Sequence, residues 1–423
     1  MVIYKNSNYI FEGIVMRPFA PARHAQSIPR SGIRDVFDRA DRVPGAISLC
    51  VGEPRHTAPD HAVDAACAAI RVGHTTYTNI LGIDAFRRAA SDYTARVKGL
   101  AYDPSTEIQA VEGATIGLFL ALKAVVDPGD EVIIPSPFFS SYEAEVLMCG
   151  GVPRMVALDP RRDMHLNAAD IENAVTDRTR AIIINSPGNP TGAVTSAREL
   201  EDVAEVCLRH GIWAISDEVY HRFSFVPGMP TAPSIAAARG MRERTIIVDS
   251  LSKTFAMTGW RIGYILAPKT IIEQTSKIAE LMHSSVNSMA QYAGTAALNG
   301  CDDAIGEMRA EYERSRALIT RTVGRTPSLG LVPAEGAFYA FIDIRATGMD
   351  SETFSGRLLD ERAVAVVPGT AFGREGAGFI RVSYAGDEHE LHEAMDRLTR
   401  FAEEHASHQV PDAMDEDALG MTA

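Results

Sequence analysis

Four short apolar runs, each ending at a polar residue or at a proline or glycine cluster, constrain the fold of this chain most. The runs are EVIIPSP at 131–137, RAIIINSP at 180–187, WAISDEVY at 213–220 and TIIVDSLSK at 245–253. Each has the length and the β-branched composition of a buried strand. Helical patterns lie between them, such as 196–211, where Gly211 is placed to end the helix. Strands that alternate with helices predict an α/β fold, with a mostly parallel sheet flanked by helices.

The last third of the sequence has a different pattern, which predicts a smaller second domain. Helical patterns at 271–285 and 304–324 are followed by strand patterns at 336–344 and 379–385. This mixture is typical of an α+β domain. The chain has 423 residues, which is more than one ordinary core accommodates.

We therefore expect a large and a small domain, with an irregular, extended N-terminal arm that contains three prolines. The polar, acidic C-terminal tail is expected to be disordered. The predicted parts are the arm at 1–30, the small domain at 31–60 and 300–402, the large domain at 61–299 and the tail at 403–423.

Composition and charge argue against several classes of protein. The net charge of −14 argues against nucleic acid or an anionic membrane as the main partner. Five cysteines, an odd number without a CxxC pair, argue against a disulfide framework and a zinc site. No apolar run approaches the roughly 20 residues of a membrane span, and the first residues do not resemble a signal peptide. We expect a cytoplasmic protein with buried free thiols and no metal.

Polar residues stand where the predicted strands end. Asn185, Asp217 and Ser250 occupy these positions, and Asn189 follows in the turn sequence NSPGNPTG at 185–192. In an open parallel sheet, ligands bind outside the carboxyl ends of the strands. The sequence therefore predicts that the chemistry lies at this edge.

Lys253 and Arg261 are eight positions apart in SLSKTFAMTGWRIGY, directly after a predicted strand. A partly desolvated lysine near other cations loses its proton readily and can condense with a carbonyl group. Arg261, together with the hydroxyl groups of Ser250 and Ser252, suits a phosphate dianion. A solvated loop lysine is the simpler reading of Lys253 alone.

Asp217 and Asn189 each allow a functional and a structural interpretation. Asp217 could keep a pyridine nitrogen protonated, with Tyr220 and Asn189 bonded to an oxygen of the same ring, or it could cap the following helix. For Asn189 alone, a plain loop is the simpler interpretation.

Arg381, in the strand pattern FIRVSYAG, could clamp a substrate carboxylate or form an internal salt bridge. Gly113, Ala114 and Thr115 begin an apolar helical pattern, where free N–H groups favour an anion, although a simple helix cap is the commoner explanation.

The combination and order of these pieces are more specific than any one of them. The sequence resembles the fold type I pyridoxal-phosphate enzymes, and among them the class I/II aminotransferases, over roughly residues 27–400. The motifs that carry the resemblance are NPTG at 189–192, DEVY at 217–220, SLSKTFAMTGWRIGY at 250–264 and FIRVSY at 379–384.

The resemblance implies a role for each matching residue. Lys253 would form the internal aldimine with pyridoxal 5'-phosphate and then act as base and acid in the proton shift. Asp217 would pair with the ring nitrogen, while Tyr220 and Asn189 would hold the phenolic oxygen. The phosphate would be bound by Arg261, Ser250, Ser252 and the N–H groups of Ala114 and Thr115.

The resemblance also implies contacts to the ring face, the substrate and a second subunit. Phe139 would stack on the ring, and Arg381 would bind the substrate α-carboxylate with help from the Gly52 backbone. Tyr77 would reach the phosphate of the neighbouring subunit, which implies a homodimer with shared active sites.

The implied activity is transamination between an amino acid and a 2-oxo acid. Thr115 occupies a position where some aspartate-specific relatives carry a lysine, and Phe138, Phe139, Phe338 and Tyr339 favour neutral or aromatic substrates, unless they only pack. A pyridoxal-phosphate lyase, synthase or cyclase acting by elimination or replacement is the alternative. A cofactor-sensing regulator is disfavoured, because residues 1–30 are too short for a DNA-binding module.

Overall fold

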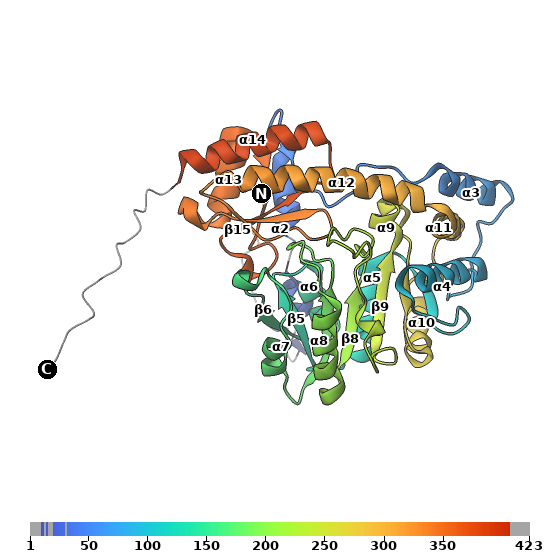
Figure 1. Ribbon diagram of the computed structural model, residues 1–423. Coiled ribbons are helices and arrows are strands. Elements are labelled where there is room, and N and C mark those ends of the chain that lie inside the picture. Colours follow the sequence, from blue (N-terminus) through green and yellow to red (C-terminus); the bar gives the residue numbers. More distant parts are fainter. Residues whose placement is uncertain (1–9, 12–13, 16–19, 30–31, 407–423) are drawn as a thin grey trace. The chain divides into compact units, whose positions relative to one another are not determined.

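The computed structural model describes residues 10–11, 14–15, 20–29 and 32–406 (Figure 1). The chain divides into two units, residues 1–30 and 31–423. In the first unit, β1 (Ile10–Phe11) pairs antiparallel with β2 (Ile14–Val15), and α1 covers Arg23–Ser27. The prediction of an irregular segment is wrong for these residues, because the isoleucines and valine favour a strand pair. The rest of residues 1–19 lies outside the described residues.

A seven-stranded sheet forms the centre of the second unit and confirms the predicted α/β fold. Five neighbouring strands are parallel, and β10 pairs antiparallel with both β9 and β4. The strand order is β4 (Ile108–Val111), β10 (Gly263–Leu266), β9 (Thr245–Ser250), β8 (Trp213–Asp217), β7 (Thr179–Asn185), β5 (Glu131–Ser136) and β6 (Val152–Ala157).

Helices cover both faces of this sheet. Consecutive strand residues are apolar and point to opposite sides, so both faces must be buried. Ile183, Ile215 and Val248 belong to the core on one face, whereas Ile182 and Ala214 belong to the core on the other. The first face packs against α5 (Ala114–Val125), α6 (Ser141–Met148) and α10 (Lys269–His283). The second packs against α4 (Asp84–Lys98), α7 (Ala168–Ala174), α8 (Ala197–His210) and α11 (Ser288–Gly300), with α3 (Asp60–Arg71) against α11.

The helix predicted at 196–211 shows how local sequence sets these boundaries. Ser196 accepts the N–H of Glu199 and the Glu199 side chain accepts the N–H of Ser196, so both ends of a capping box are present. Gly211 ends α8 in the left-handed conformation, at φ 67°.

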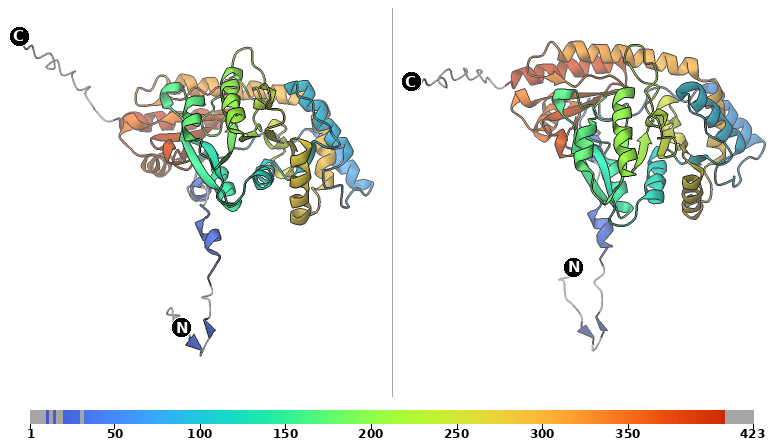
Figure 2. Two further views of the ribbon diagram at one scale, coloured as in Figure 1. Left: turned by 90° about the horizontal axis from the view of Figure 1, so that it is seen from below. Right: turned by 60° about the horizontal axis from the view of Figure 1, so that its bottom comes forward.

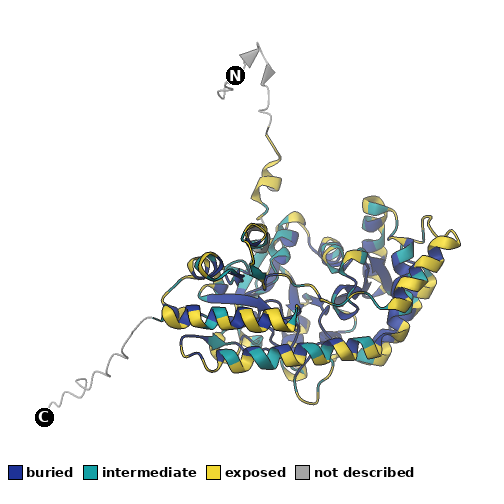
Figure 3. Cartoon of the chain, turned by 90° about the horizontal axis from the view of Figure 1, so that it is seen from above, coloured by how far each residue is buried: buried dark blue, intermediate teal, exposed yellow. Residues whose placement is uncertain are grey.

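A separate four-stranded antiparallel sheet lies to one side of the seven-stranded sheet in the second unit (Figure 2). Its order is β11 (Gly330–Leu331), β12 (Tyr339–Asp343), β15 (Phe379–Ser383) and β14 (Val367–Pro368). The helices around it are α2 (Gly32–Ala40), α12 (Asp302–Val323), α13 (Ser351–Arg362) and α14 (Glu388–Glu404). These helices expose one side to solvent, whereas the strands beneath them are buried (Figure 3).

A short pair of parallel strands joins an early and a late segment of the second unit. β3 (Ile47–Ser48) pairs with β13 (Val364–Ala365), and the Ser383 N–H donates to the Leu49 carbonyl oxygen at 2.8 Å. This pairing places the segment that contains Gly52 beside β15, although the two are more than 300 positions apart. The division into a large and a small domain stays a prediction.

Several boundaries differ from the sequence-based expectation. β9 ends at Ser250 and a helical turn, α9 (Leu251–Thr254), carries Lys253, so this lysine lies in neither the strand nor an open loop. α14 continues to Glu404, inside the tail predicted from 403, because Phe401 and Ala402 are buried against the core. Residues 407–423 of that tail lie outside the described residues.

Short 3-10 turns complete the described chain, at Pro160–Arg162, Ile235–Ala237, Thr258–Trp260, Arg345–Thr347 and Arg374–Gly376. Four of the cysteines are buried as expected, but Cys67 is exposed on the outer face of α3. Among the described residues, no helix combines the length and the apolar character that crossing a membrane requires.

Candidate functional site

A cavity of about 270 Å³ opens where the carboxyl ends of β7, β8 and β9 meet the start of α5 and the strands of the smaller sheet. Its described lining is Gly52, Ala114, Thr115, Leu118, Phe139, Tyr142, Asn185, Asn189, Asp217, Val219, Tyr220, Ser250, Ser252, Lys253, Thr258, Arg261, Tyr339 and Arg381. The cavity therefore lies at the predicted edge of the sheet.

Lys253 is held on the short helix α9, one turn after β9 ends. The Ser250 side chain accepts the Ser252 N–H at 3.1 Å and so caps the start of this helix. The Lys253 Nζ donates to the Gly52 carbonyl oxygen at 2.5 Å. Burial lowers the pKa of Lys253 to about 8; the charges of Arg381 and Arg261 act in the same direction, and Glu53 opposes them. This amine gives up its proton more easily than an ordinary lysine.

Arg261 and the first turn of α5 form a cradle for an anion. Arg261 adopts a left-handed backbone conformation, and its guanidinium donates to the carbonyl oxygens of Thr258 (2.9 Å) and Glu112 (3.1 Å). Gly113 lies against this guanidinium at φ 83°, where an added Cβ would stand 2.6 Å from Arg261 Nη2. Only glycine fits there, and it lets the guanidinium approach the start of α5 closely. The unpaired N–H groups of a helix N-terminus favour an anion at this place.

The hydroxyl groups of Ser250 and Ser252 complete the cradle. The Ser250 Oγ donates to the Ser252 Oγ at 2.8 Å, and both residues line the cavity. A guanidinium, two hydroxyls and a helix N-terminus together form a donor set that suits a phosphate dianion.

Asp217 is buried at the end of β8 and has one side-chain partner among the described residues. Its Oδ2 accepts a hydrogen bond from the Tyr142 hydroxyl at 2.6 Å, and its Oδ1 accepts the Val219 N–H at 3.4 Å. Burial raises the pKa of Asp217 to about 6, although the bond from Tyr142 opposes the rise. A cationic ligand group in the cavity would stabilise the ionised carboxylate.

Arg381 is almost fully buried, at 2% exposure, and forms no salt bridge with any described residue. Its Nη1 donates to the Asn189 Oδ1 at 3.0 Å and its Nη2 to the Cys50 carbonyl oxygen at 2.5 Å, while its Nε lacks a partner among the described residues. A buried guanidinium without an anion is costly. This arrangement points to an anionic ligand rather than to the internal salt bridge considered from the sequence.

Asn189 is itself fixed by its neighbour in the sheet. Its N–H donates to the Asn185 Oδ1 at 2.8 Å, and the Asn185 Nδ2 donates to the Asp217 carbonyl oxygen at 3.1 Å. These bonds join the ends of β7 and β8 and hold Asn189 beside Arg381.

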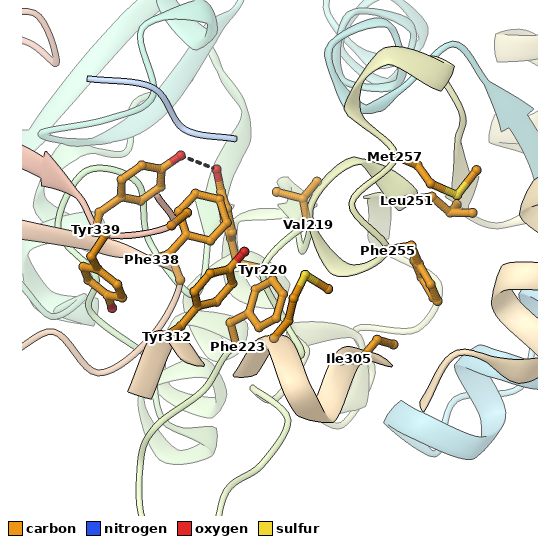
Figure 4. Close-up of a cluster of buried hydrophobic side chains, with 14 of the residues drawn as sticks. Val219, Tyr220, Phe223, Leu251, Phe255, Met257, Ile305, Tyr312, Phe338 and Tyr339 are labelled. Carbon is orange, nitrogen blue, oxygen red and sulfur yellow. Dashed lines mark hydrogen bonds between the residues drawn. The ribbon is translucent and has the colours of Figure 1, made fainter. Parts of the chain in front are cut away.

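Two tyrosine rings form one wall of the cavity. The hydroxyls of Tyr220 and Tyr339 are 2.8 Å apart, and the rings pack edge to face (Figure 4). The Arg381 guanidinium lies over the Tyr339 ring, 4.5 Å from its centre. An added Cβ at Gly52 would stand 2.1 Å from the Tyr339 hydroxyl, so this close approach requires glycine.

The cavity brings together the predicted site residues with one exception. Tyr77 is 85% exposed and does not line it, so its predicted role toward a neighbouring subunit stays a prediction. Of the four aromatics considered for substrate preference, Phe139 and Tyr339 line the cavity, whereas Phe138 and Phe338 pack in the buried cores.

The predicted set missed Tyr142, Leu118, Val219 and Thr258, and it gave no role to Asn185 although that residue was expected at this edge of the sheet. Tyr142 stands three positions after Phe139, at the start of α6, and nothing in its local sequence signals a bond to Asp217, 75 positions away. Asn185 ends β7 as expected, and this position was the available signal for it.

The residues present fit the pyridoxal phosphate that the sequence predicted. The cradle around Arg261 suits its phosphate, the Asp217 carboxylate suits a protonated ring nitrogen, and Lys253 lines the same cavity with a readily deprotonated amine. Arg381 lines the same cavity, where a substrate carboxylate would supply the anion that its guanidinium lacks among the described residues.

Comparisons with known proteins agree with this chemistry. Residues 44–398 match the family described as aminotransferase class I and II, whose members depend on pyridoxal phosphate. The chain is 40% identical to an aspartate aminotransferase of Pyrococcus abyssi, over 88% of this chain and 96% of the relative. It is 39% identical to aromatic-amino-acid aminotransferase 2 of Thermococcus litoralis, over the same shares.

A solved structure shows the same fold. The aromatic aminotransferase of Pyrococcus horikoshii superimposes with a TM-score of 0.83 at 41% identity, covering 87% of this chain and 99% of that one. Family match, sequence identity and fold agree over nearly the whole described second unit, and the chain therefore belongs to the class I and II aminotransferase family.

Proposed function

We propose that this aminotransferase uses pyridoxal 5'-phosphate to move an amino group between a neutral or aromatic amino acid and a 2-oxo acid. The proposed substrate preference rests on the number of positively charged side chains that line the cavity. Among its described lining residues, the cationic side chains are Lys253, Arg261 and Arg381. Each has a task in the proposed site, so no further cation is left for a second substrate carboxylate.

The residues that would hold the cofactor all line the cavity. Arg261, Ser250, Ser252 and the N–H groups of Ala114 and Thr115 hold the phosphate, and Phe139 covers a ring face. Asp217 pairs with the ring nitrogen, oriented by Tyr142. Tyr220 and Asn189 donate to the phenolic oxygen. When bound, pyridoxal phosphate supplies an aldehyde and an electron-withdrawing ring, which stabilises negative charge on the substrate α carbon.

Lys253 moves the proton in this site. Because its pKa is about 8, roughly a tenth of the amine is neutral at pH 7, against about one part in three thousand for an ordinary lysine. A neutral amine can bond to an aldehyde and, once released, accept a proton from the substrate α carbon.

Arg381 orients the substrate. The remaining N–H groups of its two Nη atoms can bind the α-carboxylate as a forked pair, while Asn189 and the Cys50 carbonyl oxygen keep the guanidinium in place. Tyr339 and Leu118 also line the cavity, and apart from the Tyr339 hydroxyl both side chains are apolar, which suits a neutral or aromatic substrate side chain.

An amino-acid panel with 2-oxoglutarate, analysed by mass spectrometry, tests the proposal. We expect the 2-oxo acids of phenylalanine, tyrosine or leucine to form with an equal amount of glutamate, faster than oxaloacetate forms from aspartate. A clear preference for aspartate would overturn the substrate assignment. Ammonia released in a control without acceptor would instead favour the elimination chemistry of a lyase.

We also propose that the protein acts as a homodimer in which Tyr77 of each subunit reaches the partner's phosphate. Large apolar side chains near Tyr77 and on α10 are exposed, including Ile70 (52%), Val72 (70%) and Leu281 (90%). Light scattering after size exclusion should give twice the chain mass of 45.8 kDa. A monomer that retains full activity would contradict this arrangement.

We propose a division into a large domain at 61–299 and a small domain at 31–60 and 300–402, which the two separate sheets support.

A further inference from the structure

A buried charged cluster, made of Lys98, Glu218 and Asp249, lies directly behind the proposed cofactor site. Lys98 is the last residue of α4, and its side chain is 1% exposed. Its Nζ donates to the Glu218 Oε2 at 2.7 Å and to the Asp249 Oδ2 at 2.9 Å. The Glu218 and Asp249 side chains are 3% and 1% exposed. One ammonium thus bridges two carboxylates away from water.

The cluster and the cavity share the same two strands but use opposite faces. Glu218 directly follows Asp217 at the end of β8, and Asp249 directly precedes Ser250 at the end of β9. Because side chains alternate along a strand, Asp249 points away from the face of Val248, which packs with α5 and α6. Asp217 pairs with Val248 in the sheet, and the Glu218 N–H donates to the Val248 carbonyl oxygen at 3.0 Å.

Further hydrogen bonds leave the cluster little freedom to rearrange. Glu218 Oε1 accepts from the hydroxyls of Ser216 (2.7 Å) and Ser234 (2.5 Å). Asp249 accepts from the Ser250 N–H (2.8 Å) and the Tyr264 hydroxyl (3.2 Å). These partners are neutral, so among the described residues bonded to the two carboxylates Lys98 is the one that offsets their negative charges.

His221 does not supply a second positive charge to the cluster. Its Nδ1 lies 2.8 Å from the Glu218 carbonyl oxygen and 3.3 Å from the Asp249 Oδ2, and its Nε2 lies 3.0 Å from the Tyr93 hydroxyl. Burial and the charge of Lys98 hold the pKa of His221 well below its usual value, so the ring is neutral. The pKa of Lys98 lies above its usual value, because the two carboxylates outweigh the effect of burial.

We propose that Lys98 is a positioning residue for the cofactor: it holds Glu218 and Asp249 together behind the sheet and thereby keeps Asp217 ionised and in place under the ring nitrogen. This inference rests on the proposed function. Without the ammonium, two uncompensated carboxylates would lie beside Asp217, and their repulsion would favour its protonated form. A protonated Asp217 cannot neutralise a positively charged ring.

The other groups around Asp217 do not replace this effect. Tyr142 on α6 donates a hydrogen bond to it, and Glu145 lies one turn further along the same helix. Burial and the proximity of Asp217 raise the pKa of Glu145 well above its usual value, which favours the uncharged form of this side chain. The cations of the cavity bond to other groups: Lys253 to the Gly52 carbonyl oxygen, Arg261 to backbone carbonyl oxygens, and Arg381 to Asn189 and the Cys50 carbonyl oxygen.

The test compares the affinities of two ligands for the full-length chain freed of cofactor. One ligand is pyridoxal phosphate and the other is its analogue with C–H in place of the ring nitrogen. Their Kd ratio measures the contact between Asp217 and the nitrogen alone. We expect Lys98→Met to lower this preference by about ten-fold or more, the effect of a shift of one pKa unit or more in Asp217. A wild-type preference in Lys98→Met would overturn the inference.

Companion variants separate the effect from a general loss of stability. Lys98→Met/Asp249→Asn returns the cluster to its natural net charge and should recover most of the preference, whereas a preference that stays lost would count against the inference. Leu398→Ala, a buried change on α14, should lower stability but leave the ratio unchanged. A fall in the ratio there would show that destabilisation alone explains the effect.

If Lys98→Met does not fold, the same ratio of Kd values is measured for Asp249→Asn. It keeps the cation and removes one negative charge, so the nitrogen preference should stay at or above the wild-type value. A fall would refute the inference. Failure of the wild-type chain to bind pyridoxal phosphate at all would be a different result, because it would refute the proposed function.

Discussion

Two groups of charged side chains lie on opposite faces of β8 and β9, and they differ in how their charges are matched. Behind the sheet, Lys98 is bonded to both Glu218 and Asp249. In the cavity, Lys253 and Arg381 bond to neutral oxygen atoms and form no ion pair with the described residues. Paired buried charges can hold a structure together, whereas unpaired ones are expensive unless a ligand completes them.

Because of this difference, the ends of β8 and β9 can stabilise the fold on one face and bind a ligand on the other. A change in the cavity should remove chemistry while the fold survives, and a change behind the sheet should affect both. The variants of Lys98 above test the cluster behind the sheet, and the following predictions test the cavity and its surroundings, from the largest expected effect to the smallest.

Lys253→Ala should lower turnover by about a thousand-fold or more, because it removes both the covalent attachment and the proton carrier. Steady-state kinetics with the preferred amino acid measure this loss. The melting temperature of the cofactor-free protein should change little, since Lys253 has no ion pair to lose. A matched change of Lys277, which is exposed on α10, should leave turnover intact.

Arg381→Ala should raise KM by about a hundred-fold, because a forked bond to a buried carboxylate contributes several kcal/mol. Cofactor binding, followed by absorbance, should survive. Loss of the cofactor with an unchanged KM would assign Arg381 to the structure instead. Arg345→Ala, whose partner is the surface residue Asp343, is a suitable control.

The rate of cofactor capture should depend on pH through Lys253. Its pKa is about 8 in the free protein, so the neutral amine and the capture rate should rise about ten-fold from pH 7 to pH 9 and then level off. Stopped-flow absorbance with the cofactor-free protein measures this profile. A rate that keeps rising to pH 10 and above would indicate an ordinary lysine.

Glu145→Gln should stabilise the fold by about 1–2 kcal/mol at pH 8 and by less at pH 5. Neither carboxylate oxygen of Glu145 has a partner among the described residues, and burial raises its pKa well above the usual value. Between the unfolded and folded pKa values the folded state binds more protons, so wild-type stability falls as pH rises, and glutamine removes that loss. Denaturant unfolding at both pH values measures it, with Glu143→Gln on the same helix as a control.

Local sequence was sufficient to predict most of the large sheet and much of the site. The runs at 131–137, 180–187, 213–220 and 245–253 became β5, β7, β8 and β9, because buried parallel strands have a distinctive composition. The edge that carries Asp217 and Ser250 followed from the same pattern.

Features that depend on distant contacts could not be predicted. The bond from Tyr142 to Asp217 joins two elements 75 positions apart, and that from Arg381 to Asn189 spans 192 positions. The cluster around Lys98 requires the end of α4 to meet two strands that follow it by more than 100 residues. No periodicity encodes such pairings, since they arise from the packing of whole elements.

Reduction of the cofactor-loaded protein with borohydride, followed by digestion and peptide mass spectrometry, tests the central claim most directly. A pyridoxyl group should be found on the peptide that contains Lys253, at one per chain, and be absent from Lys98, which the two carboxylates keep charged. A label on another lysine, or no label on a chain that is fully active, would contradict the account.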